Sequence, residues 1–493
     1  MIVDLNRDNF EYDVHSLVKA FWPEEQVQVL TPATAPEKRA RLEGDTVIWV
    51  ELNEADAVVK VADVVCHGKN TAGTCGQEAT TQEAERNGQW SVFSWQAENR
   101  TLSAAPGDYK DGFKRFFYQT LCEVNHRTLP WGNLTGIRPT KLAYAMLEEG
   151  MNEESIVKAL QDKHLVSEEK ALLSIDIAAR ERELLSGIHY DEGYSLYIGI
   201  PFCPTTCLYC SFTSYAIGAY RKVVDAYVDC VIKEMEYVSK RYAHKILDTV
   251  YIGGGTPTTL EPEQLDRLLG RLKELFDFST VKEFTVEAGR ADSITREKLE
   301  VLKKYGVERI SVNPQTMKQE TLDIIGRRAS VAQTVEAYAL AREVGFENIN
   351  MDLILGLPGE TEADVKHTID RVTELAPDSL TVHSLAIKRA SRLSEWVKEH
   401  GITTLKNTDA TMEIAAEGAR KLGMQPYYLY RQKNMSGNFE NVGYAKPGKY
   451  GIYNILIMEE KQTIVALGAG SITKLVLPDG RIERCDNVKD VQL

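Results

Sequence analysis

Residues 193 to 400 repeat one pattern six times: a short β-branched strand, a loop and a longer amphipathic helix. The strand candidates are 195–200, 249–252, 283–287, 309–312, 348–354 and 379–383. The amphipathic helix candidates between them include 223–241, 262–276, 296–305, 332–344 and 362–375. Such alternation implies a parallel sheet with right-handed crossovers. Six units predict an α/β fold, a partial (β/α)6 TIM-like barrel, whose active site would lie at the carboxyl ends of the strands.

The unusual residues of the chain fall at those carboxyl ends. They are Gly253 to Pro257 after the second strand, Glu287 at the end of the third, Gln315 after the fourth, Asp352 at the end of the fifth, and His383 to Arg389 after the sixth. Placement of all these groups on one rim favours a single site.

Three cysteines, Cys203, Cys207 and Cys210, lie on the loop after the first strand with the spacing C-x3-C-x2-C. Thiolates at this spacing can ligate three irons of a [4Fe–4S] cube, which leaves one iron open to an exogenous ligand. A structural zinc site needs four ligands, and the nearest further cysteine, Cys230, falls in a predicted helix. Buried unreactive cysteines are the other alternative, although three on one loop are hard to explain that way.

The other rim groups each have two interpretations. Gly253 to Gly255 would let a ligand approach the backbone closely, or would form a tight turn. Glu287 and Asp352 would accept hydrogen bonds from ribose hydroxyls, or would cap the following helices. Arg327, followed by Arg328, would clamp a carboxylate, or the two would form a solvated basic pair.

The rest of the 493-residue chain predicts three further regions. Residues 1–105 read as a small α+β domain, residues 106–188 as a helical connector before the barrel at 189–400, and residues 401–493 as an α+β cap. The cap is predicted to contain a strand pair near 452–458 and 462–467, and we expect it to close the barrel and cover the substrate.

Charge and hydropathy exclude some classes of function. The formal net charge of −14 opposes a large nucleic-acid-binding face. No run of about 18 apolar residues predicts a membrane span, and the N-terminus lacks the features of a secretory signal. We therefore expect a cytoplasmic protein with reduced cysteines.

These motifs resemble those of a known family. The segment from Tyr197 to Phe212, together with Gly253 to Pro257, Val286-Glu287, Gln315, Arg327 and Met351 to Gly359, resembles radical S-adenosylmethionine (SAM) proteins related to oxygen-independent coproporphyrinogen III oxidase. The stretches from Leu134 to Thr140 and from Leu429 to Met435 point to the long HemZ-type subgroup.

The resemblance implies that Cys203, Cys207 and Cys210 bind a [4Fe–4S] cluster whose open iron is chelated by S-adenosylmethionine, with a second S-adenosylmethionine able to sit beside the first. The positions that match S-adenosylmethionine contacts of the family are Tyr197, Tyr209, Gly254, Gly255, Thr256, Glu287, Gln315, Arg327, Asp352 and Ala386.

It also implies a reaction. A 5′-deoxyadenosyl radical would abstract hydrogen from a propionate of a tetrapyrrole, and loss of carbon dioxide and one electron would leave a vinyl group. A low-potential donor such as flavodoxin or ferredoxin would supply the reducing electron. Candidate cations for the propionates are Lys388, Arg389, Arg431 and Lys433.

Two positions depart from the classical oxidase, which has a histidine at Gly199 and a further cysteine at Phe212. The related heme chaperones share the phenylalanine, which makes a heme-binding and transfer protein the second hypothesis. Chaperones carry a C-terminal histidine as a plausible iron ligand, and this chain has Tyr453-Asn454 there. A third hypothesis is a radical enzyme on another substrate, with His383 as an acid or base or simply a barrel-filling residue.

Overall fold

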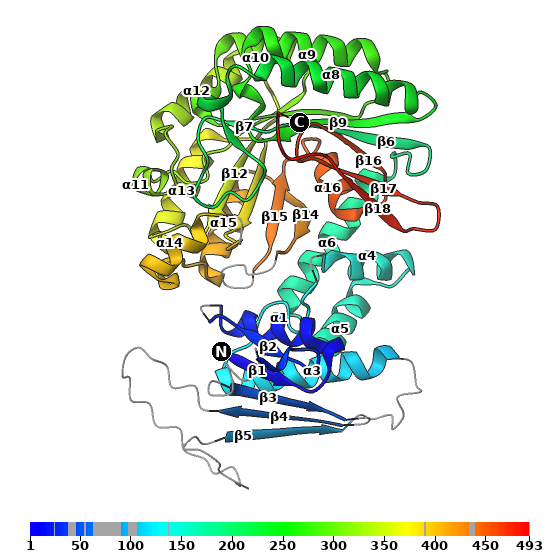
Figure 1. Ribbon diagram of the computed structural model, residues 1–493, viewed down its shortest axis with the longest axis vertical. Coiled ribbons are helices and arrows are strands. Elements are labelled where there is room, and N and C mark those ends of the chain that lie inside the picture. Colours follow the sequence, from blue (N-terminus) through cyan, green and yellow to red (C-terminus); the bar gives the residue numbers. More distant parts are fainter. Residues whose placement is uncertain are drawn as a thin grey trace. The chain divides into compact units, whose positions relative to one another are not determined.

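The computed structural model describes residues 1–23, 25–37, 46–53, 56–62, 90–96, 106–136, 138–388, 391–432 and 439–492 (Figure 1). Two of the predicted substrate-binding cations, Arg389 and Lys433, lie outside these ranges. The chain forms two compact units, Met1–Ile137 with Met151–Leu172, and Arg138–Gly150 with Leu173–Leu493. The helical stretch 106–188 is thus divided between the two units.

The first unit is a five-stranded sheet covered on one face by helices. Its strands follow the order β2-β1-β3-β4-β5, with bounds β1 Ile2–Leu5, β2 Gln28–Leu30, β3 Thr46–Leu52, β4 Asp56–Ala62 and β5 Trp90–Gln96. Alternate residues of β3 and β4, such as Val50 and Val59, are fully buried and pack with Phe113 of α3 (Pro106–Asn125) and Val14 of α1 (Glu11–Phe21). Period-two burial of this kind is what one covered face requires. Helix α5 (Glu153–His164) also belongs to this unit.

Six parallel strands form the centre of the second unit, and they neighbour one another in chain order. They are β6 Gly193–Ile200, β9 Ile246–Gly254, β10 Glu283–Gly289, β11 Arg309–Val312, β12 Ile349–Leu355 and β13 Ser379–Ser384. This confirms the predicted partial barrel: every expected strand forms, and the sheet stays open.

Helices cover the outer face of this sheet (Figure 1). The predicted helices form as α8 Val224–Arg241, α9 Pro262–Leu275, α10 Arg296–Lys304, α12 Val331–Glu343 and α13 Glu362–Leu375. Side-chain caps set the starts of α12 and α13, since Ser330 and Thr361 each accept from the backbone amide three residues on and form capping boxes. The residues of β6 that face these helices, such as Leu196 and Ile198, are apolar and fully buried. The polar residues of the strands face the inner side of the sheet.

Shorter elements complete the second unit. They are α4 Thr140–Glu148, α6 Glu168–Leu185, which spans the boundary between the units, β7 Phe202–Cys203, β8 Tyr215–Ala216, α7 Ile217–Tyr220, α11 Gln319–Ile324, α14 Leu393–His400 and α15 Asp409–Lys421. Among the described residues no helix is both long and apolar enough to cross a membrane.

The C-terminal residues extend the sheet at both edges. Strands β15 (Asn441–Ala445) and β14 (Gln425–Tyr430) add antiparallel beyond β13, while β16 (Ile464–Leu467) adds parallel beside β6 and is followed by β17 (Ile472–Val476) and β18 (Ile482–Asp486). The prediction of a strand at 452–458 is wrong, because Ile452–Glu459 forms helix α16. An apolar run of eight residues fits either element, and here Tyr453, Ile455, Leu456 and Glu459 are buried at helical spacing.

A buried polar cluster ties β16 to the amino end of the barrel. Asp248, fully buried at the start of β9, accepts from Gln462 Nε2 at 2.6 Å and from the His189 amide at 3.0 Å, and it lies 2.8 Å from His189 Nδ1. Gln462 in turn accepts from Ser195 Oγ at 2.8 Å. These contacts hold the first strand, the second strand and the C-terminal addition together.

Candidate cofactor site

The three cysteines lie on one loop at the carboxyl end of β6. Cys203 ends β7, where its Sγ lies 3.5 Å from Thr256 Oγ1, and a turn joins the Cys210 amide to the Cys207 carbonyl at 3.2 Å. All three are free thiols, and Cys207 is only 8% exposed. The loop therefore presents three sulfurs within one small region.

Neighbouring elements hold this loop from two sides. The Leu208 amide donates to the Ile325 carbonyl at 2.9 Å, and Thr205 Oγ1 donates to the Gly326 carbonyl at 2.9 Å, just after α11. On the other side, the Leu393 amide donates to the Leu208 carbonyl at 3.0 Å. The protein's own hydrogen bonds thus hold the loop, which suits a site that must fix three ligands.

The electrostatic surroundings of the thiols favour the neutral form in the absence of a metal. Burial raises the pKa of Cys203 to about 11 and raises that of Cys210 as well. Among the described residues, no three His, Cys, Asp or Glu side chains converge on a single ion. A cube differs from such a site because each cysteine binds a different iron, so this absence does not bear on a cluster at the three cysteines.

The glycine run at the end of β9 needs its glycines for steric reasons. Gly254 has φ of +109°, which L side chains rarely adopt, and a Cβ at Gly255 would lie 2.6 Å from the Phe202 carbonyl oxygen. A Cβ at Gly253 would lie 2.9 Å from Tyr251 and 3.0 Å from Glu287. The run therefore packs against the cysteine loop, and Gly253 and Gly254 belong to strand β9 and not to a tight turn.

Glu287 lies on the inner face of the barrel rather than at a helix cap. Tyr251 Oη donates to Glu287 Oε1 at 2.5 Å, and burial raises the pKa of this carboxyl to about 7. The Tyr251 ring stacks on that of Tyr453 of α16 at 4.4 Å, and the Tyr197 ring lies 6.2 Å from Tyr251 and 6.1 Å from Tyr453. Three tyrosines from β6, β9 and α16 thus fill the space beside this carboxyl.

Gln315 and Asp352 meet through the backbone. The Gln315 amide donates to the Asp352 carbonyl at 2.9 Å, and the Ile354 amide donates back to the Gln315 carbonyl at 3.0 Å. Gln315 has φ of +68°, a strained value for a residue with a side chain. The Asp352 carboxylate accepts from Asn350 Nδ2 at 2.7 Å and is not a helix cap.

Two buried polar atoms on this rim lack a partner among the described residues: Gln315 Oε1 and Arg327 Nε. Arg327 donates through Nη1 to the Asn313 carbonyl and lies beside Tyr209 and Cys207, which raise its pKa against the effect of burial. Arg328 is exposed, so the structure separates the two arginines. Orphaned buried groups cost free energy, and a polar ligand would satisfy them.

The remaining predicted residues surround the same opening. Ala386 lies two residues after β13, and Tyr209 lies between two of the cysteines. His383 is an inward residue of β13 whose Nδ1 lies 3.2 Å from Tyr430 Oη, and burial lowers its pKa. A neutral imidazole bonded to a tyrosine can fill the barrel or exchange a proton with a ligand.

One predicted cation lies close to the cysteines. Lys388 Nζ lies 5.5 Å from the centre of the Phe212 ring, which is 71% exposed. Burial lowers the pKa of Lys388, and Cys210 opposes that effect. Arg431 follows β14 and is buried. Among the predicted substrate-binding cations that the structure describes, Lys388 is thus the one that can reach an anionic group beside the cluster loop.

Gly199 is explained by the strand added next to it. A Cβ at this position would lie 3.3 Å from the Leu467 carbonyl of β16, and the Gly199 carbonyl accepts from Tyr227 Oη at 2.7 Å. The C-terminal strand therefore takes up the space on this side of β6. A larger side chain at position 199 would require the end of β16 to move.

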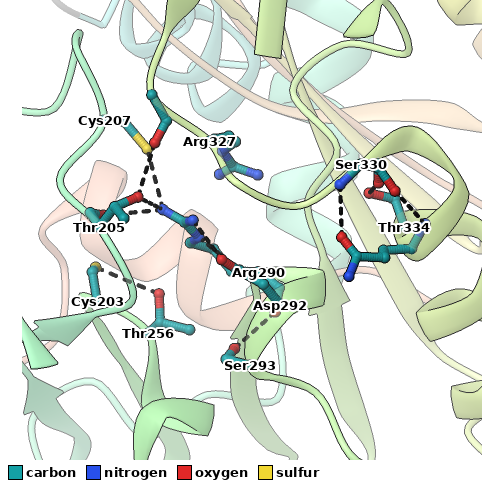
Figure 2. A network of polar contacts seen from close by, with 12 residues as sticks. Cys203, Thr205, Cys207, Thr256, Arg290, Asp292, Ser293, Arg327, Ser330 and Thr334 are labelled. Atoms are coloured by element: carbon teal, nitrogen blue, oxygen red, sulfur yellow. Dashed lines mark hydrogen bonds and ion pairs between the residues drawn. The ribbon is translucent and has the colours of Figure 1, made fainter. Parts of the chain in front are cut away.

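A buried arginine that the sequence analysis did not single out also contacts the cysteine loop. Arg290 follows β10 and donates to Thr205 (Figure 2). An isolated arginine after a strand carries no distinctive signal, because its role depends on a contact with a loop that is 85 residues away along the chain. The structure otherwise brings all the described candidates to one rim.

These residues fit the predicted cofactors. Three thiols on a preformed loop suit a cluster with one open iron, and the cramped glycines, the inward Glu287 and the unpartnered atoms of Gln315 and Arg327 suit a polar ligand beside it. Sequence reasoning placed these groups on one rim because parallel strands bring their carboxyl ends together, and the site they would form stays a prediction.

Comparisons with known proteins agree with this geometry. The pattern of the radical SAM superfamily matches residues 197–372. The chain is 44% identical to the oxygen-independent coproporphyrinogen-III oxidase-like protein HemZ of Bacillus subtilis over 369 residues, which is 74% of each chain. It is 38% identical to the heme chaperone HemW of the same organism over 195 residues, which is 39% of this chain and 51% of that protein.

A third relative is the oxygen-independent coproporphyrinogen III oxidase of Escherichia coli, which is 33% identical over 192 residues, 39% of this chain and 42% of that protein. The match to HemZ covers 74% of this chain, whereas the other two matches cover 39% each. The chain therefore belongs to the radical SAM superfamily, whose members use a [4Fe–4S] cluster and S-adenosylmethionine, and within it to the HemZ-type oxygen-independent coproporphyrinogen III oxidase-like proteins.

Proposed function

We propose that this chain is a radical SAM enzyme that oxidatively decarboxylates propionate side chains of coproporphyrinogen III to vinyl groups. The observation that carries the proposal is the 44% identity to a coproporphyrinogen-III oxidase-like protein over 369 residues. The preformed rim supports it, because a cluster, S-adenosylmethionine and an anionic substrate each find residues of the required chemistry there.

Cys203, Cys207 and Cys210 would hold the cluster, and the inward residues of the rim, with Gln315 and Arg327 foremost, would hold S-adenosylmethionine. When bound, these two groups supply a 5′-deoxyadenosyl radical that removes hydrogen from a propionate. The protein's part is to orient the propionate and exclude water. Lys388 would pair with a carboxylate close to the cluster loop, and a low-potential flavodoxin or ferredoxin in the cytoplasm would supply the electron.

The chaperone is the second candidate, since the chain also shares 38% identity with a heme chaperone over 195 residues. One observation opposes it. Tyr453, which stands where chaperones carry the histidine, is 4% exposed, its ring is stacked 4.4 Å from that of Tyr251, and its amide donates to Glu283 at 3.0 Å. A side chain held in this way is not available as a ligand for an exchanged heme.

The test is an anaerobic assay of the reconstituted chain with dithionite, S-adenosylmethionine and coproporphyrinogen III. We expect 5′-deoxyadenosine and a porphyrinogen that has lost carbon dioxide, both detected by mass spectrometry. In Cys207→Ala both products should fall below detection, whereas Cys230→Ala, at an exposed cysteine outside the site, should match the wild type. Formation of 5′-deoxyadenosine without decarboxylation would contradict the proposed substrate but would still support the radical chemistry.

A variant of Lys388 tests the proposed substrate contact. Lys388→Met should raise the KM for coproporphyrinogen III by about tenfold, the loss of one charge-assisted contact, with the iron content unchanged. Lys398→Met, at an exposed lysine of α14, serves as the matched control. Tight stoichiometric binding of heme by the wild type, without decarboxylation, would favour the chaperone instead.

A further inference from the structure

Arg290 is a buried cation next to the cysteine loop. It follows β10 directly, after Gly289 with φ of +54°, and its side chain is 3% exposed. Buried arginines are rare unless their charge is compensated. The contacts of its guanidinium should therefore show which groups compensate this charge.

One edge of the guanidinium is compensated by Asp292. Nε donates to Asp292 Oδ1 at 3.0 Å and Nη2 donates to Oδ2 at 2.7 Å. This bidentate geometry fixes the plane of the guanidinium. Asp292 is only two residues away and 17% exposed. This local ion pair therefore orients the other end of the Arg290 guanidinium.

The other end points at the cluster loop. Nη1 donates to the Thr205 carbonyl at 3.0 Å and to Thr205 Oγ1 at 2.8 Å, and it lies 3.8 Å from Cys207 Sγ (Figure 2). Thr205 passes its own hydroxyl hydrogen to the Gly326 carbonyl, so its oxygen is free to accept. Arg290 thus contacts both the backbone that sets the position of Cys207 and the sulfur itself.

We propose that Arg290 is a positioning residue for the cluster: through Thr205 it sets the position of Cys207, and it donates a charged N–H···S hydrogen bond to the sulfur of Cys207. Hydrogen bonds to cluster sulfurs and nearby positive charge stabilise the reduced state, which carries one more electron, and so raise the reduction potential. Arg290 makes the cluster easier to reduce by a low-potential donor. The inference rests on the proposed cluster and not on the substrate.

The test measures the midpoint potential of the reconstituted cluster, without S-adenosylmethionine, by following the reduced cluster by electron paramagnetic resonance in an anaerobic titration. Arg290→Gln retains the three cysteines and removes the charge. We expect iron and sulfide contents close to those of the wild type and a tenfold lower ratio of reduced to oxidised cluster at a given potential, which is a shift of about 59 mV to lower potential for one electron.

Two further variants separate charge, geometry and general loop support. Arg392→Gln is the matched control, because Arg392 also donates to the cysteine loop, at the Thr206 carbonyl at 2.5 Å, and is exposed. Its midpoint should equal that of the wild type. Arg290→Lys keeps the charge but cannot form the fork, so its midpoint should fall between those of the wild type and Arg290→Gln.

A wild-type midpoint in Arg290→Gln would overturn the proposal, and so would an equal shift in Arg392→Gln. If Arg290→Gln takes up no iron, Arg290→Lys decides: a midpoint below that of the wild type supports the inference and a wild-type midpoint overturns it. The decarboxylation assay can fail while these potentials behave as expected, so the two proposals are tested independently.

Discussion

The two ends of the parallel sheet each hold buried polar residues, but they are satisfied differently. At the amino end, Asp248 accepts from Gln462 and from the His189 amide within 3.0 Å. At the carboxyl end, Gln315 Oε1 and Arg327 Nε are buried with no partner among the described residues. Burying an unpaired polar group costs free energy, and Arg309 Nε and Asn348 Oδ1 at the amino end also lack a described partner. Gln315 and Arg327 differ from these two because they lie on the rim that carries the three cysteines, where a ligand could satisfy them.

Positive φ occurs at both ends but in different settings: at the amino end Ala376 and Glu460 are left-handed C-caps of α13 and α16, a common way for a helix to end. Gln315 and Gly254 adopt positive φ at the carboxyl end, where the backbone turns toward the cysteine loop. Strain persists only when the surrounding structure enforces it, and it gathers at functional sites. The comparison yields three predictions that distinguish the ends by what each loses on mutation: stability or ligand affinity.

The largest expected effect is on stability at the amino end. Asp248→Ala should lower the free energy of unfolding by about 4 kcal/mol, because it leaves the donors of His189 and Gln462 unpaired in a buried site. Urea unfolding followed by circular dichroism measures this. Asp370→Ala, at an exposed pair with Lys366, should cost below about 0.5 kcal/mol. Equal costs at the two positions would break the comparison.

The second prediction concerns pH and the carboxyl end. Burial raises the pKa of Glu287 from 4.5 to about 7, so the folded chain holds this proton more tightly than the unfolded chain. The resulting stabilisation is complete below pH 4.5 and is lost as the pH rises through 7, by up to about 3 kcal/mol in total.

The neutral isostere Glu287→Gln removes this titration. The difference in unfolding free energy between the wild type and Glu287→Gln should therefore shift against the wild type as the pH rises through 7. Unfolding curves at a series of pH values measure the difference. A constant difference across that range would mean that Glu287 is ionised in the folded chain at all these pH values.

The smallest effect should be on ligand affinity. Gln315→Ala removes an amide oxygen that has no protein partner, so stability should change by less than about 0.5 kcal/mol, while the Kd for S-adenosylmethionine rises about tenfold, or about 1.4 kcal/mol. Equilibrium dialysis with the reconstituted chain measures the affinity.

The matched control for Gln315 is Gln333, which is exposed and accepts from the Ser330 amide at 2.9 Å in the capping box of α12. Gln333→Ala should show the opposite pattern: a loss of about 1 kcal/mol in stability and an unchanged Kd. If Gln315→Ala destabilised the chain without weakening binding, the amide would be a structural group after all.

Some of this molecule could be predicted from its sequence. Strand β11 has the predicted bounds Arg309–Val312 and helix α13 the predicted bounds Glu362–Leu375, since buried β-branched runs and amphipathic helices carry local signals. The position of the candidate site could also be predicted from the sequence, because the carboxyl ends of parallel strands lie on the same side of the sheet. Helix α16 was missed because its apolar run is short and its environment decides its conformation.

The sequence by itself determined the repeating units and the chemistry each places at its strand end: thiols, glycines, acids, an amide and a guanidinium. Only the tertiary structure decided which of those groups are unpartnered, that β16 packs beside β6 against Gly199, and that Arg290 reaches Cys207. The physical reason is distance along the chain. Local patterns encode strands and helices, whereas the partner of a buried polar atom can be any residue that the fold brings near.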